Sequence, residues 1–188
     1  MYPEDDSSGA VFTPPEVKVL VGGSNVEKLA DLALEFKPDV VGIADLGKQA
    51  RLAERLACSK IKIVAGDDEC AALAAIKVDI VIAGIVGIAG LSSMIKAVEA
   101  GQTIGLANKE SLVSAGHVIS HAAEKHGARL IPLDSEHSAI FQCLNQENIN
   151  NLDHITITAS GGPFLNKSKK DLENIKPKDA IKHPVWNM

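Results

Sequence analysis

The sequence of 188 residues has few aromatic side chains, no long apolar run and no excess of basic residues. Aromatic residues make up 3% of the chain, too few to build the stacking surfaces that single-stranded nucleic acids need. The formal net charge of −5 argues against a general nucleic-acid surface, which requires a basic excess. No apolar run reaches the roughly 18 residues of a transmembrane helix, so no membrane span is expected.

Cysteine is scarce as well. Cys58, Cys70 and Cys143 are widely spaced and form no C-x-x-C pair, which favours reduced, buried side chains over a redox role. Residues 1–16 hold three prolines, four acidic residues and few apolar ones, so we expect them to be disordered. They lack the basic-then-apolar order of a secretory signal, and the cytosol is therefore the expected location.

What the chain does contain is a regular alternation of strand-like and helix-like segments. Helical periodicity fills the intervals between short apolar runs, and this order is typical of βαβ units with a mostly parallel sheet. We predict an α/β fold with a doubly wound, Rossmann-like sheet. The expected strands are residues 17–21, 40–44, 61–64, 79–83, 103–107 and 129–133.

The pattern changes after Leu133, and we expect a domain boundary between residues 133 and 150. A helix is expected at 138–144. Residues 154–158 alternate polar and apolar side chains, which predicts a strand with one face covered. A capping-box pattern at 168–171 predicts a further helix start. We therefore expect a first domain with a dinucleotide-binding type of architecture at residues 17–133 and a second domain that begins at residue 134.

Two carboxylates, Asp134 and Glu136, follow the last expected strand and flank the hydroxyl of Ser135. Ligands bind at the carboxyl ends of strands in α/β sheets. Two oxygen ligands at such a place suit Mg²⁺ or Mn²⁺. The same residue types are also typical of the first turn of a helix, where they cap it and favour its dipole. Both interpretations stay open on the residues alone.

Three other segments follow expected strands. Residues 84–90 have the spacing G-x-x-G-x-x-G, which is not the dinucleotide fingerprint but could let a backbone approach a cofactor. Asn108 is a natural helix N-cap, whereas Lys109 opposes the helix dipole and suggests an anionic or carbonyl-bearing ligand. Residues 160–162, Ser-Gly-Gly, could form an anion-binding nest or a plain tight turn.

Together these segments resemble the 1-deoxy-D-xylulose-5-phosphate reductoisomerase family of the non-mevalonate isoprenoid route. The most specific matches are A-N-K-E-S-L-V at 107–113, L-D-S-E-H at 133–137 and S-G-G-P-F at 160–164. Further matches are G-S-N-V at 23–26, A-G-I-V-G-I-A-G-L at 83–91 and H-P-V-W-N-M at 183–188. They occur in the family's order, and the resemblance covers the chain from about Val17 to its end. It implies that residues 17–133 form the NADPH-binding domain and that residues 134–188 are the beginning of the α/β catalytic domain.

The resemblance implies an NADPH- and metal-dependent rearrangement and reduction of 1-deoxy-D-xylulose 5-phosphate to 2-C-methyl-D-erythritol 4-phosphate. The residues implied to contact NADPH are Gly23, Ser24, Asn25, Asn108 and Glu110. The implied ligands of Mg²⁺ or Mn²⁺ are Asp134 and Glu136, and the implied catalytic set is Lys109, Asp134, Glu136 and His183. The implied substrate contacts are Lys109, Ser135, Glu136, Ser160 at the phosphate, His183, and Trp186 on a closing flap. Ser24 is uncharged, whereas a basic side chain would better hold the 2′-phosphate of NADPH. The expectation of NADPH rather than NADH therefore rests on the resemblance.

The chain also departs from the family. The family's first strand and Gly-rich phosphate loop have no counterpart, which leaves the predicted Rossmann-like sheet incomplete, with two strand edges that need a partner. The family continues past the end of this sequence with a further phosphate site, another metal-binding Glu and a helical domain. We therefore expect this chain to be a fragment of the enzyme with little or no turnover alone. Full-length members of the family are expected, by resemblance, to be homodimers.

Two alternatives remain. The chain could be a non-catalytic remnant or partner-binding module that associates with a complementary chain, as the missing central strand suggests. It could also be another NAD(P)-dependent dehydrogenase of the same fold. The D-S-E-H and S-G-G-P-F segments argue against that second alternative.

Overall fold

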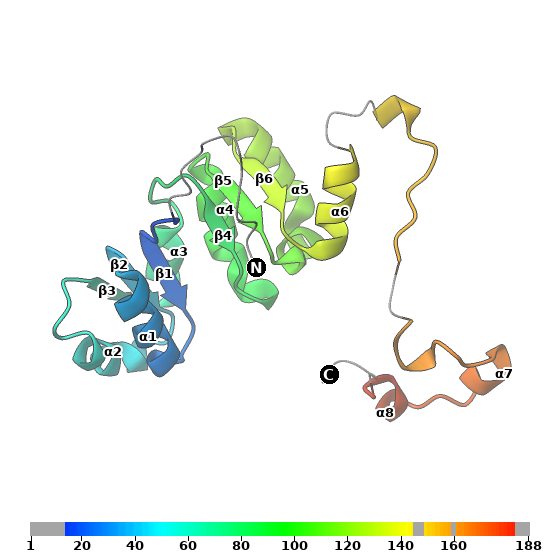
Figure 1. Ribbon diagram of the computed structural model, residues 1–188, viewed down its shortest axis with the longest axis horizontal. Coiled ribbons are helices and arrows are strands. Elements are labelled where there is room, and N and C mark those ends of the chain that lie inside the picture. Colours follow the sequence, from blue (N-terminus) through cyan, green and yellow to red (C-terminus); the bar gives the residue numbers. More distant parts are fainter. Residues whose placement is uncertain (1–13, 145–148, 159–160, 183–188) are drawn as a thin grey trace, which may run out of the picture. The chain divides into compact units, whose positions relative to one another are not determined.

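The computed structural model describes residues 14–144, 149–158 and 161–182 (Figure 1). Contacts between residues divide the chain into two compact units, Met1–Phe141 and Gln142–Met188. Most of the segment expected to be disordered, residues 1–16, lies outside the described residues. So do Ser160, His183 and Trp186.

The first unit contains two parallel sheets of three strands each. Strand β1 pairs with β2, and β2 pairs with β3, while β4 pairs with β5, and β5 pairs with β6. The strands are β1 (Val19–Gly22), β2 (Val40–Ile43), β3 (Lys62–Ala65), β4 (Val81–Ala83), β5 (Thr103–Leu106) and β6 (Arg129–Pro132). The predicted α/β class with parallel strands is confirmed. The six strands form two separate sheets, and no strand in the described part of the chain joins β1 of the first sheet to β4 of the second.

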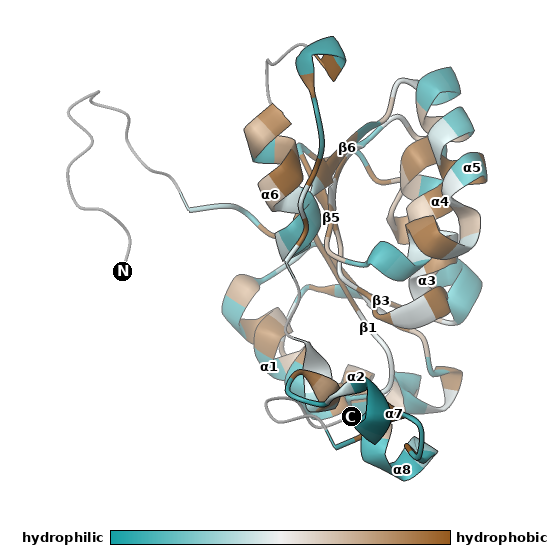
Figure 2. Cartoon of the chain, turned by 90° about the vertical axis from the view of Figure 1, so that its right-hand side faces the viewer, coloured by the Kyte–Doolittle hydropathy of each residue, from teal (hydrophilic) through white to brown (hydrophobic). Residues whose placement is uncertain are grey.

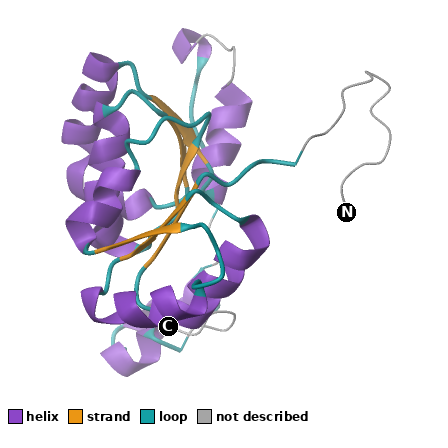
Figure 3. Cartoon of the chain, turned by 90° about the vertical axis from the view of Figure 1, so that its left-hand side faces the viewer, coloured by secondary structure: helices purple, strands orange, loops and turns teal. Residues whose placement is uncertain are grey.

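Helices connect consecutive strands and cover both faces of the strand layer (Figure 3). Helices α3, α4 and α5 lie on one side of the strands and α1 on the other (Figure 2). The helices are α1 (Val26–Phe36), α2 (Gln49–Arg55), α3 (Asp67–Leu73), α4 (Leu91–Glu99), α5 (Lys109–His126) and α6 (Ser135–Leu144). Short 3₁₀ turns precede two of them, η1 (Leu46–Lys48) and η2 (Gly87–Gly90).

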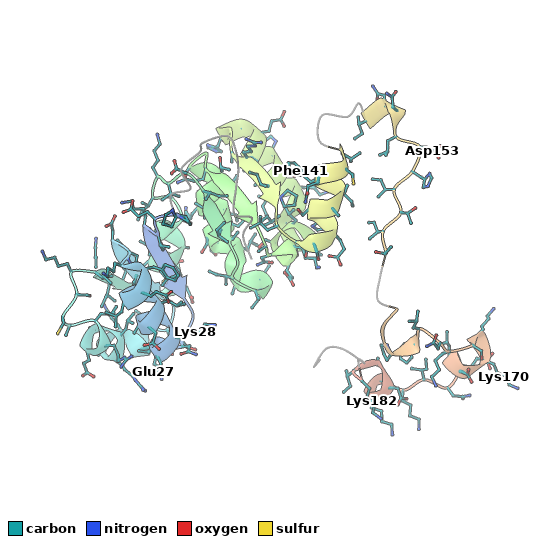
Figure 4. The ribbon with its side chains drawn as sticks, viewed as in Figure 1. Glu27, Lys28, Phe141, Asp153, Lys170 and Lys182 are labelled. Carbon is teal, nitrogen blue, oxygen red and sulfur yellow. The ribbon has the colours of Figure 1, made fainter. Side chains whose placement is uncertain are left out.

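The ends of the helices follow from local chemistry. The Asn25 side chain caps α1 by accepting a 3.1 Å hydrogen bond from the Lys28 amide. Glu27 lies in the first turn of α1 (labelled in Figure 4), where it favours the helix dipole, and its carboxylate pairs with Arg51 of α2 at 2.6 Å. Helix α5 ends at Gly127 in the left-handed conformation, with φ 70°, as the sequence predicted.

Each sheet has its own hydrophobic core, and the two cores share no residue. The first core packs α1 and α2 on the β1–β3 sheet, and the second packs α4 and α5 on the β4–β6 sheet. The first consists of Val26, Leu29, Ala30, Ala33, Val41, Ile43, Leu52, Leu56 and Ala65. The second consists of Met94, Ala97, Val98, Ile104, Leu106, Ile119 and Ala123. The split between the sheets is therefore also a split between cores.

Helix α3 links the two sheets from the face opposite α1. Val41 and Ile43 face the first core, so Gly42 between them faces the other side of β2. A Cβ added at Gly42 would lie 2.9 Å from Cys70 Sγ and from Leu73 Cδ1 of α3. The absence of a side chain at Gly42 therefore lets α3 lie close to the sheet. The helix after the third strand thus changes faces, as a doubly wound fold requires.

Several sequence-based expectations were wrong in detail. Residues 154–158 form no strand, and the described part of the second unit contains no other strand that could pair with them. Helix α6 begins at Ser135 rather than at residue 138. Cys70 is buried as expected, and burial raises the pKa of its thiol, but Cys58 and Cys143 are exposed. The capping box at Ser168 is confirmed in α7 (Lys169–Leu172), which precedes α8 (Pro177–Ala180).

No helix in the described part of the chain is long and apolar enough to cross a membrane.

Candidate functional site

The carboxyl ends of β4, β5 and β6 meet at one edge of their sheet because the three strands are parallel. The backbone amides of Ala107 and Asn108 both donate to the Ala83 carbonyl, at 3.1 Å each. The amide of Leu133 donates to the Leu106 carbonyl at 2.8 Å. These bonds place the 84–90 loop, the start of α5 and the start of α6 next to one another.

Asn108 organises this edge through all the polar atoms of its side chain. Its Nδ2 donates to the carbonyl oxygens of Ile85 and Gly87, the second at 2.9 Å. Its Oδ1 caps α5 by accepting from the Ser111 amide at 3.3 Å. The residue is 4% exposed. A Cβ at Gly90 would lie 2.7 Å from Asn108 Nδ2, so the glycine lets the loop close around the amide.

Lys109 and Asp134 join the second and third of these strand ends. Lys109 Nζ donates to Asp134 Oδ2 at 2.9 Å, and the two side chains are 49% and 12% exposed. Lysine at the start of a helix opposes the helix dipole, so the carboxylate supplies the compensating charge. The sequence left the position of Lys109 at a helix start unexplained, and the structure shows that its partner is a carboxylate that follows β6.

This ion pair shifts both groups toward their charged forms. The hydrogen bond from Lys109 lowers the pKa of the Asp134 carboxyl, and the positive charge of Lys109 lowers it further, whereas desolvation acts in the opposite direction. The same hydrogen bond raises the pKa of the Lys109 ammonium. The pair's contribution to stability is present above the unfolded carboxyl value of about 3.9. It is lost as the pH falls through the lower folded value.

The second oxygen of Asp134 has the character of a metal ligand. Asp134 Oδ1 is buried and has no hydrogen-bond partner. His137 Nδ1 is 3.8 Å away, too far for a hydrogen bond. The neighbouring carboxylate of Glu136 accepts from the Ser135 hydroxyl at 3.2 Å. An unpaired carboxylate oxygen next to a second carboxylate fits a divalent cation.

These two carboxylates cannot complete a metal shell by themselves. The described residues contain no group of three or more His, Cys, Asp or Glu side chains that could hold a metal ion. Mg²⁺ is commonly bound through one or two carboxylates together with waters and substrate oxygens. The arrangement therefore suits a cation that is shared with a substrate.

We predict that Lys109→Met raises the pKa of Asp134 toward the ordinary carboxyl value of about 3.9, because it removes the hydrogen bond and the nearby positive charge. An NMR titration of the side-chain carboxyl carbons measures the change. Lys125→Met, at the exposed end of the same helix, serves as the control and should leave Asp134 unchanged. An Asp134 titration unaffected by Lys109→Met would contradict the assigned pair.

The other predicted residues lie elsewhere in the described structure. Gly23, Ser24 and Asn25 are exposed and follow β1 of the other sheet, with Asn25 engaged as the cap of α1. Glu110 is exposed in the first turn of α5, where its charge favours the dipole. Gly161 and Gly162 have φ of 76° and 59°, a conformation that occurs both in tight turns and in anion-binding nests.

Sequence reasoning recognised Asn108 as a cap but missed its two bonds to the 84–90 loop. The spacing of the glycines after β4 indicated a loop that approaches other backbone closely. It did not indicate which side chain holds that loop, because Ile85 and Asn108 are 23 positions apart. The available signal was that the polar residue Asn108 follows β5, which is the next strand after β4 in the chain. The carboxyl ends of neighbouring parallel strands lie close together, so a side chain after β5 can reach the loop after β4.

Comparison with protein families finds two models that match the sequence. The family model described as 1-deoxy-D-xylulose 5-phosphate reductoisomerase matches residues 13–116. The model of the C-terminal domain of the same reductoisomerase matches residues 130–188. Both halves of the described edge, the 84–90 loop and the acidic pair, therefore lie within matched segments.

Individual proteins give the same result. The 1-deoxy-D-xylulose 5-phosphate reductoisomerase of Geobacillus sp. (strain WCH70) is 45% identical over 167 residues, which is 88% of this chain and 44% of that protein. The enzyme from Zymomonas mobilis in complex with NADPH superposes with a TM-score of 0.82 at 41% identity, covering 88% and 44% of the two chains.

A second solved structure, a DOX-P reductoisomerase in complex with NADPH, fosmidomycin and magnesium, has a TM-score of 0.75 at 42% identity. The alignment covers 92% of this chain and 45% of that one. The chain therefore spans about half the length of the relatives it matches.

Proposed function

The chain belongs to the 1-deoxy-D-xylulose 5-phosphate reductoisomerase family, and we propose that it supplies part of the site for that family's reaction. The reaction is the NADPH- and divalent-metal-dependent conversion of 1-deoxy-D-xylulose 5-phosphate to 2-C-methyl-D-erythritol 4-phosphate. The observation that supports this proposal is the cluster of Lys109, Asp134 and Glu136 at one strand edge, where a carboxylate oxygen lacks a hydrogen-bond partner.

In this proposal Asp134 and Glu136 hold Mg²⁺ or Mn²⁺, and Lys109 and Ser135 contact the sugar phosphate. A bound divalent cation would polarise the carbonyl of the substrate. Lys109 donates a hydrogen bond to one oxygen of Asp134, so the other oxygen would be the one that binds the cation. Lys109 carries an ammonium at neutral pH, as lysine ordinarily does, and this charge could contact an anionic substrate oxygen.

NADPH would approach the glycine loop and the start of α1. A Cβ at Gly23, Gly84 or Gly87 would meet no atom within 4 Å, so a ligand has open access to their backbone. Bound there, the cofactor would supply hydride for the reduction. The residues that we propose contact it are Gly23, Ser24, Asn25, Asn108 and Glu110. The amide hydrogens of Asn108 are used within the chain, so it would contribute mainly by shaping the loop.

The remaining roles rest on the resemblance in sequence. We propose that Ser160 contacts the phosphate end of the substrate, that His183 lines the pocket as a catalytic residue, and that Trp186 belongs to a segment that closes over it. An indole above the substrate would exclude water during the reaction.

We predict that the purified chain shows little or no turnover by itself, because it covers only 44% to 46% of the length of the relatives that it matches. The measurement is the loss of NADPH absorbance in the presence of Mn²⁺ and 1-deoxy-D-xylulose 5-phosphate. The control is a full-length family member at equal concentration. Steady oxidation of NADPH above the substrate-free background would contradict this prediction.

A further inference from the structure

Helix α5 carries two exposed histidines, His117 and His121, on the face opposite its buried side. Successive residues of an α-helix are about 100° apart around the helix axis. Ile119 lies between the two histidines in the sequence, is 1% exposed and belongs to the second core. Both histidines are therefore on the outer face of α5, where they contribute neither to the core nor to the candidate site at the strand edge.

The spacing of the two histidines allows both rings to bind one ion. Residues four positions apart in a helix lie on the same face, with Cβ atoms about 5–6 Å apart. Zinc helices of the H-E-x-x-H type hold their metal with two histidines at this same spacing. Helix α5 departs from helical geometry at Ala115, where φ is −137° and ψ is 26°, so the segment from His117 to His121 lies in its regular part.

Neither imidazole is engaged by another group in the described part of the chain. No hydrogen bond or ion pair within those residues involves His117 or His121. His154 differs in this respect, because its Nδ1 lies 2.7 Å from an oxygen of Asp153. The ring nitrogens of the pair are therefore available to a ligand that accepts electron pairs.

The charges next to the pair neither favour nor oppose a cation. Glu124 follows His121 by three positions and Lys125 follows it by four, and both are exposed on the same side of α5. Their opposite charges offset each other. The affinity of this place for a metal ion therefore depends on the two ring nitrogens.

Imidazole selects a different class of metal from the carboxylates at the strand edge. Carboxylate oxygens suit Mg²⁺ and Mn²⁺, whereas imidazole nitrogens suit Zn²⁺, Cu²⁺ and Ni²⁺. The described residues contain no group of three or more His, Cys, Asp or Glu side chains that could hold a metal ion. An ion bound by two histidines would therefore complete its shell with water.

We propose that His117 and His121 form a second metal site, which binds a divalent cation of the Zn²⁺, Cu²⁺ and Ni²⁺ class through both imidazole rings. The site uses no residue of the strand edge and lies on the outer face of α5. It goes beyond the proposed function and does not depend on NADPH, on the sugar phosphate or on the cation at Asp134.

The test uses the full chain and Cu²⁺, because Cu²⁺ is the most tightly bound ion of the first-row divalent series. Excess Mg²⁺ is present throughout to compete for the carboxylates. At one equivalent of Cu²⁺ we expect an electron paramagnetic resonance spectrum with nitrogen hyperfine structure from two imidazoles. A folded chain that retains no Cu²⁺, or that holds it with oxygen ligands alone, would overturn the proposal.

Single substitutions identify the ligands. His117→Ala or His121→Ala removes one nitrogen ligand and should weaken Cu²⁺ binding by about tenfold or more. His126→Ala is the matched control, since His126 is an exposed histidine in the last turn of α5, about 140° from His121 around the helix axis. This control should bind Cu²⁺ as the unmodified chain does, and circular dichroism confirms that each variant is folded. Equal loss in all three variants would contradict the assigned ligands.

A rearranged variant tests the spacing itself. Val118→His combined with His121→Ala keeps the number of histidines but makes two of them adjacent in α5, where neighbouring side chains do not face each other. Val118 is 60% exposed, so this change leaves the core intact. The variant should bind Cu²⁺ as weakly as His121→Ala does. Binding as tight as that of the unmodified chain would overturn a site that requires the four-residue spacing.

Competition between metals separates this site from the one at the strand edge. Excess Zn²⁺ should displace Cu²⁺ from the two imidazoles, whereas the same excess of Mn²⁺ should not, because Mn²⁺ prefers oxygen ligands. Equal displacement by Zn²⁺ and Mn²⁺ would assign the copper to carboxylates and overturn the proposal. Asp134→Asn should leave Cu²⁺ binding unchanged, so a failure of the proposed function and a failure of this inference give different results.

Discussion

Asn108→Ala should lower the free energy of unfolding by about 3 kcal/mol, because three hydrogen bonds are lost at about 1 kcal/mol each. Two of these bonds hold the 84–90 loop, so amide hydrogen exchange in that loop should accelerate as well. Urea unfolding followed by circular dichroism gives the change in stability. Asn108→Ser keeps a hydroxyl that can cap α5 but cannot donate to both carbonyls. Its free energy of unfolding should lie between those of the unmodified chain and Asn108→Ala.

Asn25→Ala is the matched control for this prediction. Asn25 is also an N-cap asparagine, but it is exposed and its side chain makes the capping bond to the Lys28 amide. Its replacement should cost about 1 kcal/mol, the usual value for a cap. Equal costs for Asn25→Ala and Asn108→Ala would show that the loop bonds of Asn108 contribute nothing, contrary to the assigned role.

Asp134→Asn should weaken Mn²⁺ binding by about tenfold or more, the largest functional effect expected of a single substitution at this edge. The change removes one of two carboxylate charges while conserving shape, and an amide is a poorer ligand for a hard cation. Titration of free Mn²⁺ by electron paramagnetic resonance measures the affinity. The same variant should lower the pKa of Lys109 toward its ordinary value, because its charged partner is gone.

Asp68→Asn provides the control, since Asp68 is an exposed acid in the first turn of α3. It changes the net charge by the same amount and should leave Mn²⁺ affinity unchanged. If both variants weaken binding equally, the cation responds to net charge rather than to a site at Asp134. If neither does, Asp134 is not a ligand in this chain.

Much of this architecture could be read from local sequence patterns. The six strands were expected within two residues of their observed bounds, and the end of α5 at Gly127 was expected at the correct residue. These features could be predicted because each depends on a short segment, such as an apolar run or a glycine that adopts positive φ. The expectation of a strand at residues 154–158 failed for the complementary reason, since a strand needs a neighbour that local alternation cannot supply.

The candidate site was also predictable only in part: the sequence indicated its charged residues but not how they pair. Asp134, Glu136 and Lys109 attracted attention because charged residues followed predicted strands, and that inference needed one segment at a time. The pairing of Lys109 with Asp134 links residues 25 positions apart, and the bonds from Asn108 to the 84–90 loop link residues more than 20 positions apart. Sequence patterns do not specify such pairs, because strand order and register decide them.

The sequence by itself determined the class of fold, the chemistry present at the strand ends and the family resemblance. The tertiary structure decided that β1 and β4 face one cavity, that their cores are separate, and that one oxygen of Asp134 is buried without a partner. The physical reason is that burial and pairing are relations between distant segments, whereas propensity and capping are properties of neighbouring residues.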